Sequence, residues 1–435
     1  WRFQAHNLSY NISVQFDGYE HKYHWIKKGI DFLIDGTKYN RDEPGLTSDI
    51  GWFFGHKLSR ADERVLFREL FRQDVDYHDK LNAETPVKTT SALGPDQRPD
   101  TWLMAHLWYS YAQKTADTKD VQVRGVAPLV FHSYPGKARI DYADAIESEG
   151  YLDEVGQEAW RKAGELWNEF GDRSIPNSRG YLIRLNDFEV FRSADRKYWE
   201  QLRELGPGVY EQLEAAKLAK LTEEERFIHE TSNAELTDEQ IGQRPAISRK
   251  LEITYEDLAN HVPAENRVEA KKLASKARIN SALASATSSY RDTINYVYWK
   301  IRCEAEQTDT MLAARKYVLE AERLYEETAL TAARAEFERA WEKWAEVYEM
   351  YPDLRGDVEA EILLEKIVLY QELLGQLSEA FPPPDFKLTS FLEYNSFEYA
   401  ELAREAFGSA TPIGSNVGEV PPSTPDSGES PSASE

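Results

Sequence analysis

The chain has 435 residues, and because 41% of them are hydrophobic it can bury a core and is not disordered throughout. Acidic residues outnumber basic ones by 76 to 52, and the net charge of −24 argues against a nucleic-acid binder and against adhesion to an anionic membrane surface. The single cysteine, Cys303, excludes an intramolecular disulfide framework and any zinc or iron–sulfur site built from several cysteines.

Apolar residues recur at helical spacing along most of the chain. Leu103, Leu107 and Tyr111 are spaced four apart, and a similar stripe runs through residues 290–301. The alternation of apolar and polar residues that is typical of strands is nearly absent. No apolar run reaches the roughly 18 residues that a transmembrane helix needs. We therefore predict an all-α protein with no transmembrane segment in this chain.

The first candidate helical hairpins lie near the N-terminus, in the sequence GIDFLIDGTKYNRDEPGLTSDIGWFFGHKLS. Gly29 and Gly36 flank Leu33, and Gly51 lies between two large residues at the spacing of a following helix. Small side chains let neighbouring helices cross closely, and this pattern resembles a tetratricopeptide repeat (TPR). The sequence departs from that repeat at Arg41, where proline is usual. The segment AWRKAGELWNEFG and residues 311–351 show related spacing.

In hairpins of this kind the first helix lines a concave surface. Counting from Gly51 and Gly164, we expect two sets of side chains to point toward such a groove. A tryptophan beside a histidine and a lysine suits an extended peptide, whereas the alternative is that Trp52 packs against the preceding helix. The candidate groove residues are Ser48, Trp52, His56, Lys57, Arg161, Glu165 and Asn168.

The acidic sequence DVDYHD at residues 74–79 has oxygen ligands at alternate positions, as in a calcium-binding loop. Asp79 stands where such a loop needs glycine and Thr85 where it needs glutamate, so we interpret the segment as a solvated helix end. Phosphate-binding loops, dinucleotide fingerprints, zinc-protease motifs and nucleophile elbows are missing from the sequence. We therefore assign no catalytic residue, metal site or cofactor.

The sequence FHSYPG at residues 131–136 follows a short apolar run that Pro128 interrupts. We predict an aromatic loop over residues 126–142, in which His132 and Tyr134 are candidate binding residues. The alternative is a buried connecting loop in which the side chains of His132 and Ser133 satisfy backbone groups.

Residues 217–262 are polar and charged, and contain two capping boxes that begin at Thr222 and Thr237. We expect a charged linker with short helices that are separated at residues 242–245. The last residues are rich in serine, proline and acids, which favours a disordered tail. The predicted division is TPR-like hairpins in residues 1–85, a helical continuation in 86–216, the linker in 217–262, a long-helix lobe in 263–408 with a hairpin at 311–351, and the tail in 409–435.

The whole chain up to about residue 395 also resembles an uncharacterised bacterial family with degenerate TPR-like repeats. The stretches that carry this resemblance are AHNLSYNISVQF, GWFFGHKLS, LVFHSYPGKARIDYADAIESEGY and INYVYWKIRCEAE. In that family the corresponding region usually follows an N-terminal hydrophobic segment. The resemblance therefore implies α-solenoid-like hairpins in two lobes and a parent protein that is anchored in a membrane or associated with the cell envelope.

The leading hypothesis from the sequence is a non-enzymatic scaffold that binds protein or peptide segments. The acidic surface favours basic partners. The competing hypothesis is a carbohydrate-active enzyme with an α/α toroid, since abundant Trp and Tyr side chains can stack on sugars. Such an enzyme needs two carboxylates across a cleft, at a separation of about 5–10 Å.

Overall fold

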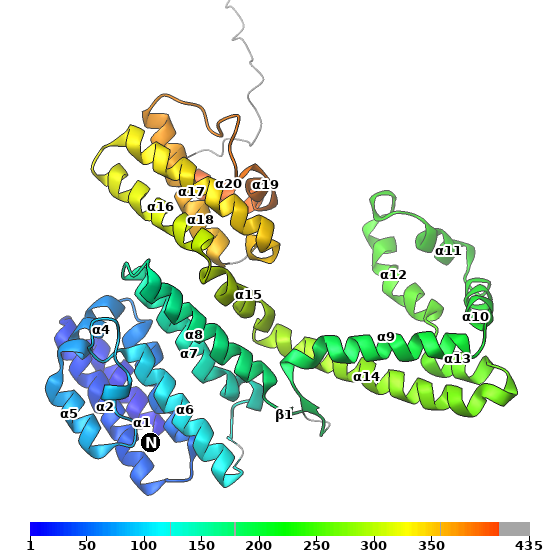
Figure 1. Ribbon diagram of the computed structural model, residues 1–435, viewed down its shortest axis with the longest axis horizontal. Coiled ribbons are helices and arrows are strands. Elements are labelled where there is room, and N and C mark those ends of the chain that lie inside the picture. Colours follow the sequence, from blue (N-terminus) through cyan, green and yellow to red (C-terminus); the bar gives the residue numbers. More distant parts are fainter. Residues whose placement is uncertain (122, 178–179, 357, 409–435) are drawn as a thin grey trace, which may run out of the picture. The chain divides into compact units, whose positions relative to one another are not determined.

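The computed structural model describes residues 1–408 apart from 122, 178–179 and 357 (Figure 1). Most of these residues are helical, which confirms the predicted all-α class. Extended structure among them is limited to the antiparallel pair of β1 (Ile175–Pro176) and β2 (Leu182–Ile183) and one isolated bridge between Leu93 and Pro99. The predicted tail, residues 409–435, lies outside the described residues.

The chain forms two compact units, residues 1–307 and 308–435. The boundary therefore falls after residue 307, and not within the segment 217–262 that was predicted to be a linker. The first part of unit 1 contains α1 (Arg2–His6), η1 (Asn7–Ile12), η2 (Ser13–Gln15), α2 (Tyr19–Tyr39), α3 (Pro44–Trp52), η3 (Phe53–Leu58), α4 (Arg64–Gln73), α5 (Val75–Glu84), η4 (Thr89–Ser91), α6 (Thr101–Lys119), α7 (Pro128–Ser148) and α8 (Glu154–Asp172).

The second part of unit 1 begins after the small β-hairpin. It contains η5 (Leu185–Asp187), α9 (Phe188–Glu204), α10 (Val209–Leu218), α11 (Glu223–Glu230), η6 (Asn233–Glu235), α12 (Asp238–Leu251), α13 (Tyr255–His261), η7 (Ala264–Asn266), α14 (Arg267–Thr293) and α15 (Tyr296–Glu306). Unit 2 contains α16 (Asp309–Glu326), α17 (Leu330–Met350), η8 (Pro352–Gly356), α18 (Val358–Gln376), α19 (Thr389–Tyr394) and α20 (Ser396–Phe407).

Glycines lie where helices of unit 1 cross most closely. A Cβ atom on Gly29 would lie 2.0 Å from Oγ of Ser9, so α2 can approach η1 only without a side chain there. A Cβ atom on Gly51 would lie 2.9 Å from the Tyr109 ring and 3.1 Å from the carbonyl oxygen of Ala105, so α3 meets α6 at this glycine. The small positions that the sequence indicated are therefore helix crossings in the core.

Large aromatic side chains fill the spaces between these helices, as the composition suggests. Trp160 and Trp167 of α8 are almost completely buried, and α8 packs against both α7 and α15. Gly164, on the same helix, faces Cys303 of α15. A Cβ atom added to Gly164 would lie 3.2 Å from the Cβ of Cys303. Burial raises the pKa of the Cys303 thiol to about 12, so this cysteine is an unreactive core residue.

The predicted aromatic loop at residues 126–142 is wrong, because most of this segment belongs to α7. Pro128 occupies the first turn, where its missing N–H costs nothing, but Pro135 lies inside the helix. Pro135 has no N–H to donate to the carbonyl of Phe131. The side-chain amide of Gln113, from α6, donates instead to the carbonyls of Phe131 at 3.5 Å and His132 at 2.8 Å. A donor from a neighbouring helix thus stabilises the interrupted turn.

The segment predicted as a charged linker forms a small helical cluster at the end of the α9–α14 hairpin (Figure 1). Leu221, Ile228 and Ile247 form its core. Both predicted capping boxes, at Thr222 and Thr237, are confirmed. The predicted break at residues 242–245 is wrong: α12 runs through them, with Pro245 inside the helix.

In unit 2, α16 and α17 pack against each other as the hairpin that was predicted over residues 311–351. The inner face of α17 carries Phe337, Trp341 and Trp344, all of which are buried. Trp341 also contacts Tyr370 of α18, with ring centroids 5.7 Å apart. Aromatic rings are therefore packed together with aliphatic side chains in the core of unit 2.

Candidate binding surface

The structure brings three of the predicted groove residues together and adds a fourth that sequence reasoning missed. Trp52, at the end of α3, stacks on His56 of η3 with ring centroids 4.9 Å apart. Tyr10 of η1 lies 5.8 Å from the Trp52 ring. The ammonium of Lys57 lies 4.1 Å from the centre of the Tyr10 ring. We call Tyr10, Trp52, His56 and Lys57 the aromatic surface.

Two π-helical segments, η1 and η3, build this surface, and they are the only such segments among the described residues. Tyr10 of η1 lies 6.3 Å from Phe53, the first residue of η3, so the two segments meet. A π-helical turn places one extra residue in a helix and turns the following side chains to a new direction, and such turns occur frequently at functional sites. Here η1 supplies Tyr10 and η3 supplies His56 and Lys57, while Trp52 is the last residue of the α-helix that precedes η3.

The aromatic rings form a continuous stack that is partly open to solvent. His6 and His56 are exposed at its two ends, while Tyr10 and Trp52 between them are partly buried. The His6 and Tyr10 rings are stacked, with centroids 4.3 Å apart. Trp52 also packs against the core of unit 1, so part of its surface is not open to a ligand.

Partial burial shapes the electrostatics of the aromatic surface. Burial lowers the pKa of Lys57, against the raising effect of Glu63, and lowers the pKa of His56, to which Arg60 contributes further. No carboxylate in the described part of the chain lies within ion-pair distance of the Lys57 ammonium. The neighbouring Arg60 is paired with Asp141 at 2.8 Å. Lys57 therefore offers a half-buried donor beside a partly exposed aromatic stack.

The other candidate groove residues do not join this surface. Ser48 is buried, because α3 is enclosed on nearly all sides. Arg161, Glu165 and Asn168 lie on the exposed face of α8. Arg161 pairs with Glu158 and Glu165 of its own helix, and the side-chain oxygen of Asn168 accepts a hydrogen bond from Asn186 at 3.2 Å. These three residues form a solvated helix face in which their polar groups already have partners.

The two loop candidates, His132 and Tyr134, are packing residues of α7. Tyr134 lies 4.9 Å from the Tyr109 ring, and His132 lies 5.0 Å from the Phe131 ring. Burial lowers the pKa of His132 to about 4, so its imidazole is neutral at pH 7. Neither residue has an arrangement of neighbours that would activate it as a base or nucleophile.

Buried carboxylates are paired with arginines and not with each other. Asp100 caps the N-terminus of α6 and pairs with Arg68 at 2.9 Å and Arg72 at 3.2 Å. Glu306 lies 3.5 Å from Arg302. These are the two carboxylates that are fully buried in the described part, so they do not form the facing pair that a glycoside hydrolase needs.

The acidic segment at residues 74–79 lies at the start of α5, as interpreted, but it is only partly solvated because Tyr77 and His78 are buried. The carboxylate of Asp74 accepts a hydrogen bond from the backbone N–H of Tyr77 and forms an ion pair with Lys27. Within the described ranges, no three His, Cys, Asp or Glu side chains converge as metal ligands would.

Comparison of the chain with protein-family models, with curated proteins and with solved structures finds no match. The resemblance to a bacterial family with TPR-like repeats therefore stays a prediction. None of the helices in the described residues combines the length and the apolar character that crossing a membrane requires.

Proposed function

We propose that this protein is a non-enzymatic helical scaffold, and that the aromatic surface binds an extended segment of another protein. The observation that carries this proposal is the partly exposed stack of aromatic rings that forms where two π-helical turns meet, beside the unpaired ammonium of Lys57. Tryptophan and tyrosine are the side chains that contribute most often to binding free energy at protein interfaces.

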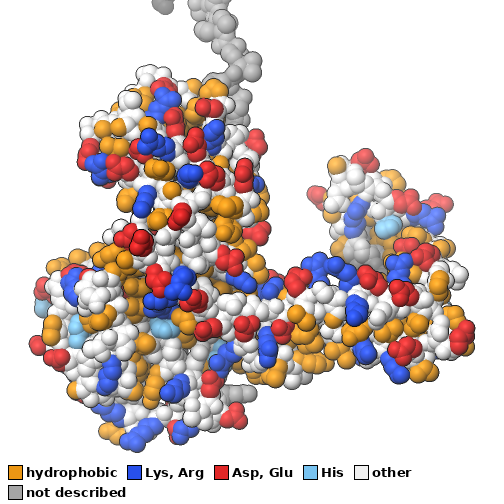
Figure 2. Space-filling model, viewed as in Figure 1, with side chains coloured by type: hydrophobic (Ala, Val, Ile, Leu, Met, Phe, Trp, Pro, Cys, Tyr) orange, Lys and Arg blue, Asp and Glu red, His pale blue; other side chains and the backbone are white. Residues whose placement is uncertain are grey.

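The chemistry of the surface indicates what the bound segment offers. Trp52 and Tyr10 provide partly exposed ring faces, on which a proline or another apolar side chain can stack. Lys57 needs an acceptor, which a backbone carbonyl or a carboxylate of the segment supplies. Figure 2 shows acidic and basic side chains interspersed over the viewed face, so the net charge of the whole chain does not set the charge at each site. The local charge here is positive, which favours an acidic segment at this surface.

Two further parts of the proposal concern architecture and location. The close crossings at Gly29 and Gly51 and the α16–α17 hairpin support degenerate TPR-like hairpins. The family resemblance supports a parent protein that is held at a membrane or in the cell envelope. A two-lobed solenoid of this kind would present the aromatic surface to protein partners.

Selection of peptides displayed on phage tests the proposal. The full chain should enrich peptides that share a proline or aromatic residue next to an acidic residue. Trp52→Ala should abolish the enrichment, while Phe227→Ala serves as the control because Phe227 is 52% exposed on α11, away from this surface. Enrichment of the same peptides by both variants would refute binding at the aromatic surface.

A further inference from the structure

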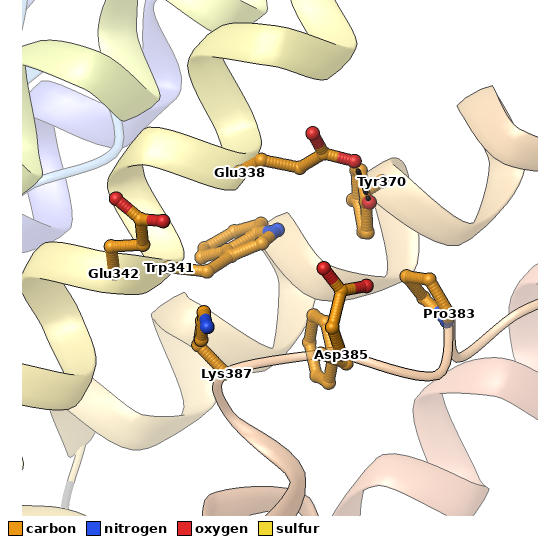
Figure 3. A pocket seen from close by; sticks show the side chains of 8 residues that line it. Glu338, Trp341, Glu342, Tyr370, Pro383, Asp385 and Lys387 are labelled. Atoms are coloured by element: carbon orange, nitrogen blue, oxygen red, sulfur yellow. Dashed lines mark hydrogen bonds between the residues drawn. The ribbon is translucent and has the colours of Figure 1, made fainter.

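A second candidate site lies within unit 2, in a cavity of about 80 Å³ between α17, α18 and the segment that follows α18 (Figure 3). Glu338, Trp341 and Glu342 line it from α17, and Tyr370 lines it from α18. The cavity is far smaller than the roughly 300–1,000 Å³ of sites that enclose a drug-sized ligand. It has room for the head group of a side chain or of a small molecule.

The lining of the cavity is acidic. It holds the carboxylates of Glu338, Glu342 and Asp385 and a single ammonium, that of Lys387. Glu338 pairs with Arg334 at 2.8 Å and accepts a hydrogen bond from the Tyr370 hydroxyl at 3.2 Å. Glu342 and Asp385 have no ion pair with any described residue, and both are exposed at the rim. The cavity therefore presents two free carboxylates to a cation.

The indole of Trp341 adds an unpartnered donor to this lining; Nε1 of Trp108 and of Trp344 is also unpartnered, but of the three only Trp341 lines the cavity. Trp341 is only 1% exposed, and its Nε1–H has no hydrogen-bond partner within the described structure. Buried indole N–H groups usually have a partner, since a missing hydrogen bond costs about 1–3 kcal/mol. Figure 3 shows the indole nitrogen on the side of the ring that faces Tyr370 and Asp385. A ligand that reaches this point would supply the missing acceptor.

The charged groups that line the cavity are suited to an organic cation and not to a metal ion. Among the described residues, no three carboxylate, imidazole or thiol groups converge closely enough to hold a metal. An alkylammonium or guanidinium group is larger, is bound by separate carboxylates, and is also attracted to aromatic rings such as those of Trp341 and Tyr370.

We propose that this cavity binds an alkylammonium or guanidinium group whose carrier also offers an oxygen acceptor to Nε1 of Trp341. A lysine or arginine residue has both features, because its cationic head and its backbone carbonyl lie at opposite ends of a flexible aliphatic side chain. The net negative charge of the chain favours basic partners, and such partners would bind at this cavity of unit 2. This site does not depend on the aromatic surface, because the two share no residue.

Calorimetry on the full chain with three blocked amino acids and one simple cation tests the proposal. Nα-acetyl-arginine methylamide and Nα-acetyl-lysine methylamide should bind. The neutral isostere Nα-acetyl-citrulline methylamide should bind at least about tenfold more weakly, because it lacks the charge. Butylguanidinium, which has no carbonyl, distinguishes a free organic cation from a residue of a polypeptide as the ligand. If it binds as tightly as the arginine compound, the role of the acceptor is overturned. Weaker binding than that of the arginine compound would support a residue of a polypeptide.

Two rim variants should change the affinity for the arginine compound in opposite directions. Asp385→Asn should weaken binding about tenfold, because it removes one free carboxylate. Lys387→Ala should strengthen binding, because it removes the competing ammonium. Asp385 and Lys387 are both exposed, so these variants should fold normally. Equal affinity for the arginine and citrulline compounds, no detectable binding of either at millimolar concentration, or the same effect of both variants would overturn the proposal.

Discussion

The interrupted turn of α7 leads to a prediction that isolates one hydrogen-bond donor. Pro135 leaves the Phe131 carbonyl without its helical donor, and the amide of Gln113 takes over by bridging this carbonyl and that of His132. Gln113→Met keeps the length of the side chain but removes the donor. The site is partly buried, so we expect the free energy of unfolding to fall by about 1–2 kcal/mol.

The same substitution should matter less when the proline is absent. Pro135→Ala restores a backbone N–H that can donate to the Phe131 carbonyl, so Gln113→Met in that background should cost about 1 kcal/mol less than in the wild type. Urea unfolding, followed by tryptophan fluorescence, gives the four free energies of this double-mutant cycle. Equal costs of Gln113→Met in both backgrounds would refute the role of Gln113 as the replacement donor.

Two further predictions concern pH and packing. Burial lowers the pKa of His106 to about 4, so the unfolded chain, with a histidine pKa of about 6.5, binds more protons between these values, and stability should fall by up to about 3 kcal/mol as the pH falls from about 6.5 to about 4. Because the pKa of His132 is lowered to about 4 as well, His106→Gln should reduce the fall of the urea midpoint over this range without abolishing it, and an unchanged pH profile would contradict this prediction. Gly51→Ala should destabilise the protein by about 1–3 kcal/mol, because the new Cβ would lie 2.9 Å from the Tyr109 ring. Gly375→Ala is the control: this glycine lies in α18, a Cβ there would meet nothing within 4 Å, and the substitution should stabilise the protein by about 0.5–1 kcal/mol. Thermal melts in which both variants shift the melting temperature in the same direction would contradict the close crossing of α3 and α6.

Local sequence signals predicted the features that depend on nearby residues. Helical periodicity predicted the all-α class, and the threonines that begin the capping boxes, Thr222 and Thr237, predicted two helix starts. Trp52 and His56 are four residues apart, so their stacking follows from helical geometry.

Features that depend on contacts between distant segments could not be predicted. Tyr10 joins Trp52 across 42 residues of chain, and nothing in either segment alone indicates that η1 and η3 meet. The segment around Pro135 was predicted to be a loop, because the amide of Gln113 that compensates for the proline comes from α6, in a distant part of the sequence. Ser48 was placed in a groove because the pattern gives the face of a helix but not how many neighbours enclose that helix.

Binding of one peptide obtained by phage selection tests the central proposal most directly. Its affinity should be measured for the wild type, Trp52→Ala, Lys57→Met and Phe227→Ala, with melting temperatures to show that each variant is folded. We predict that Trp52→Ala weakens binding by at least about tenfold, that Lys57→Met weakens it less, and that Phe227→Ala leaves it unchanged. Unchanged affinity of the folded Trp52→Ala variant would contradict binding at the aromatic surface.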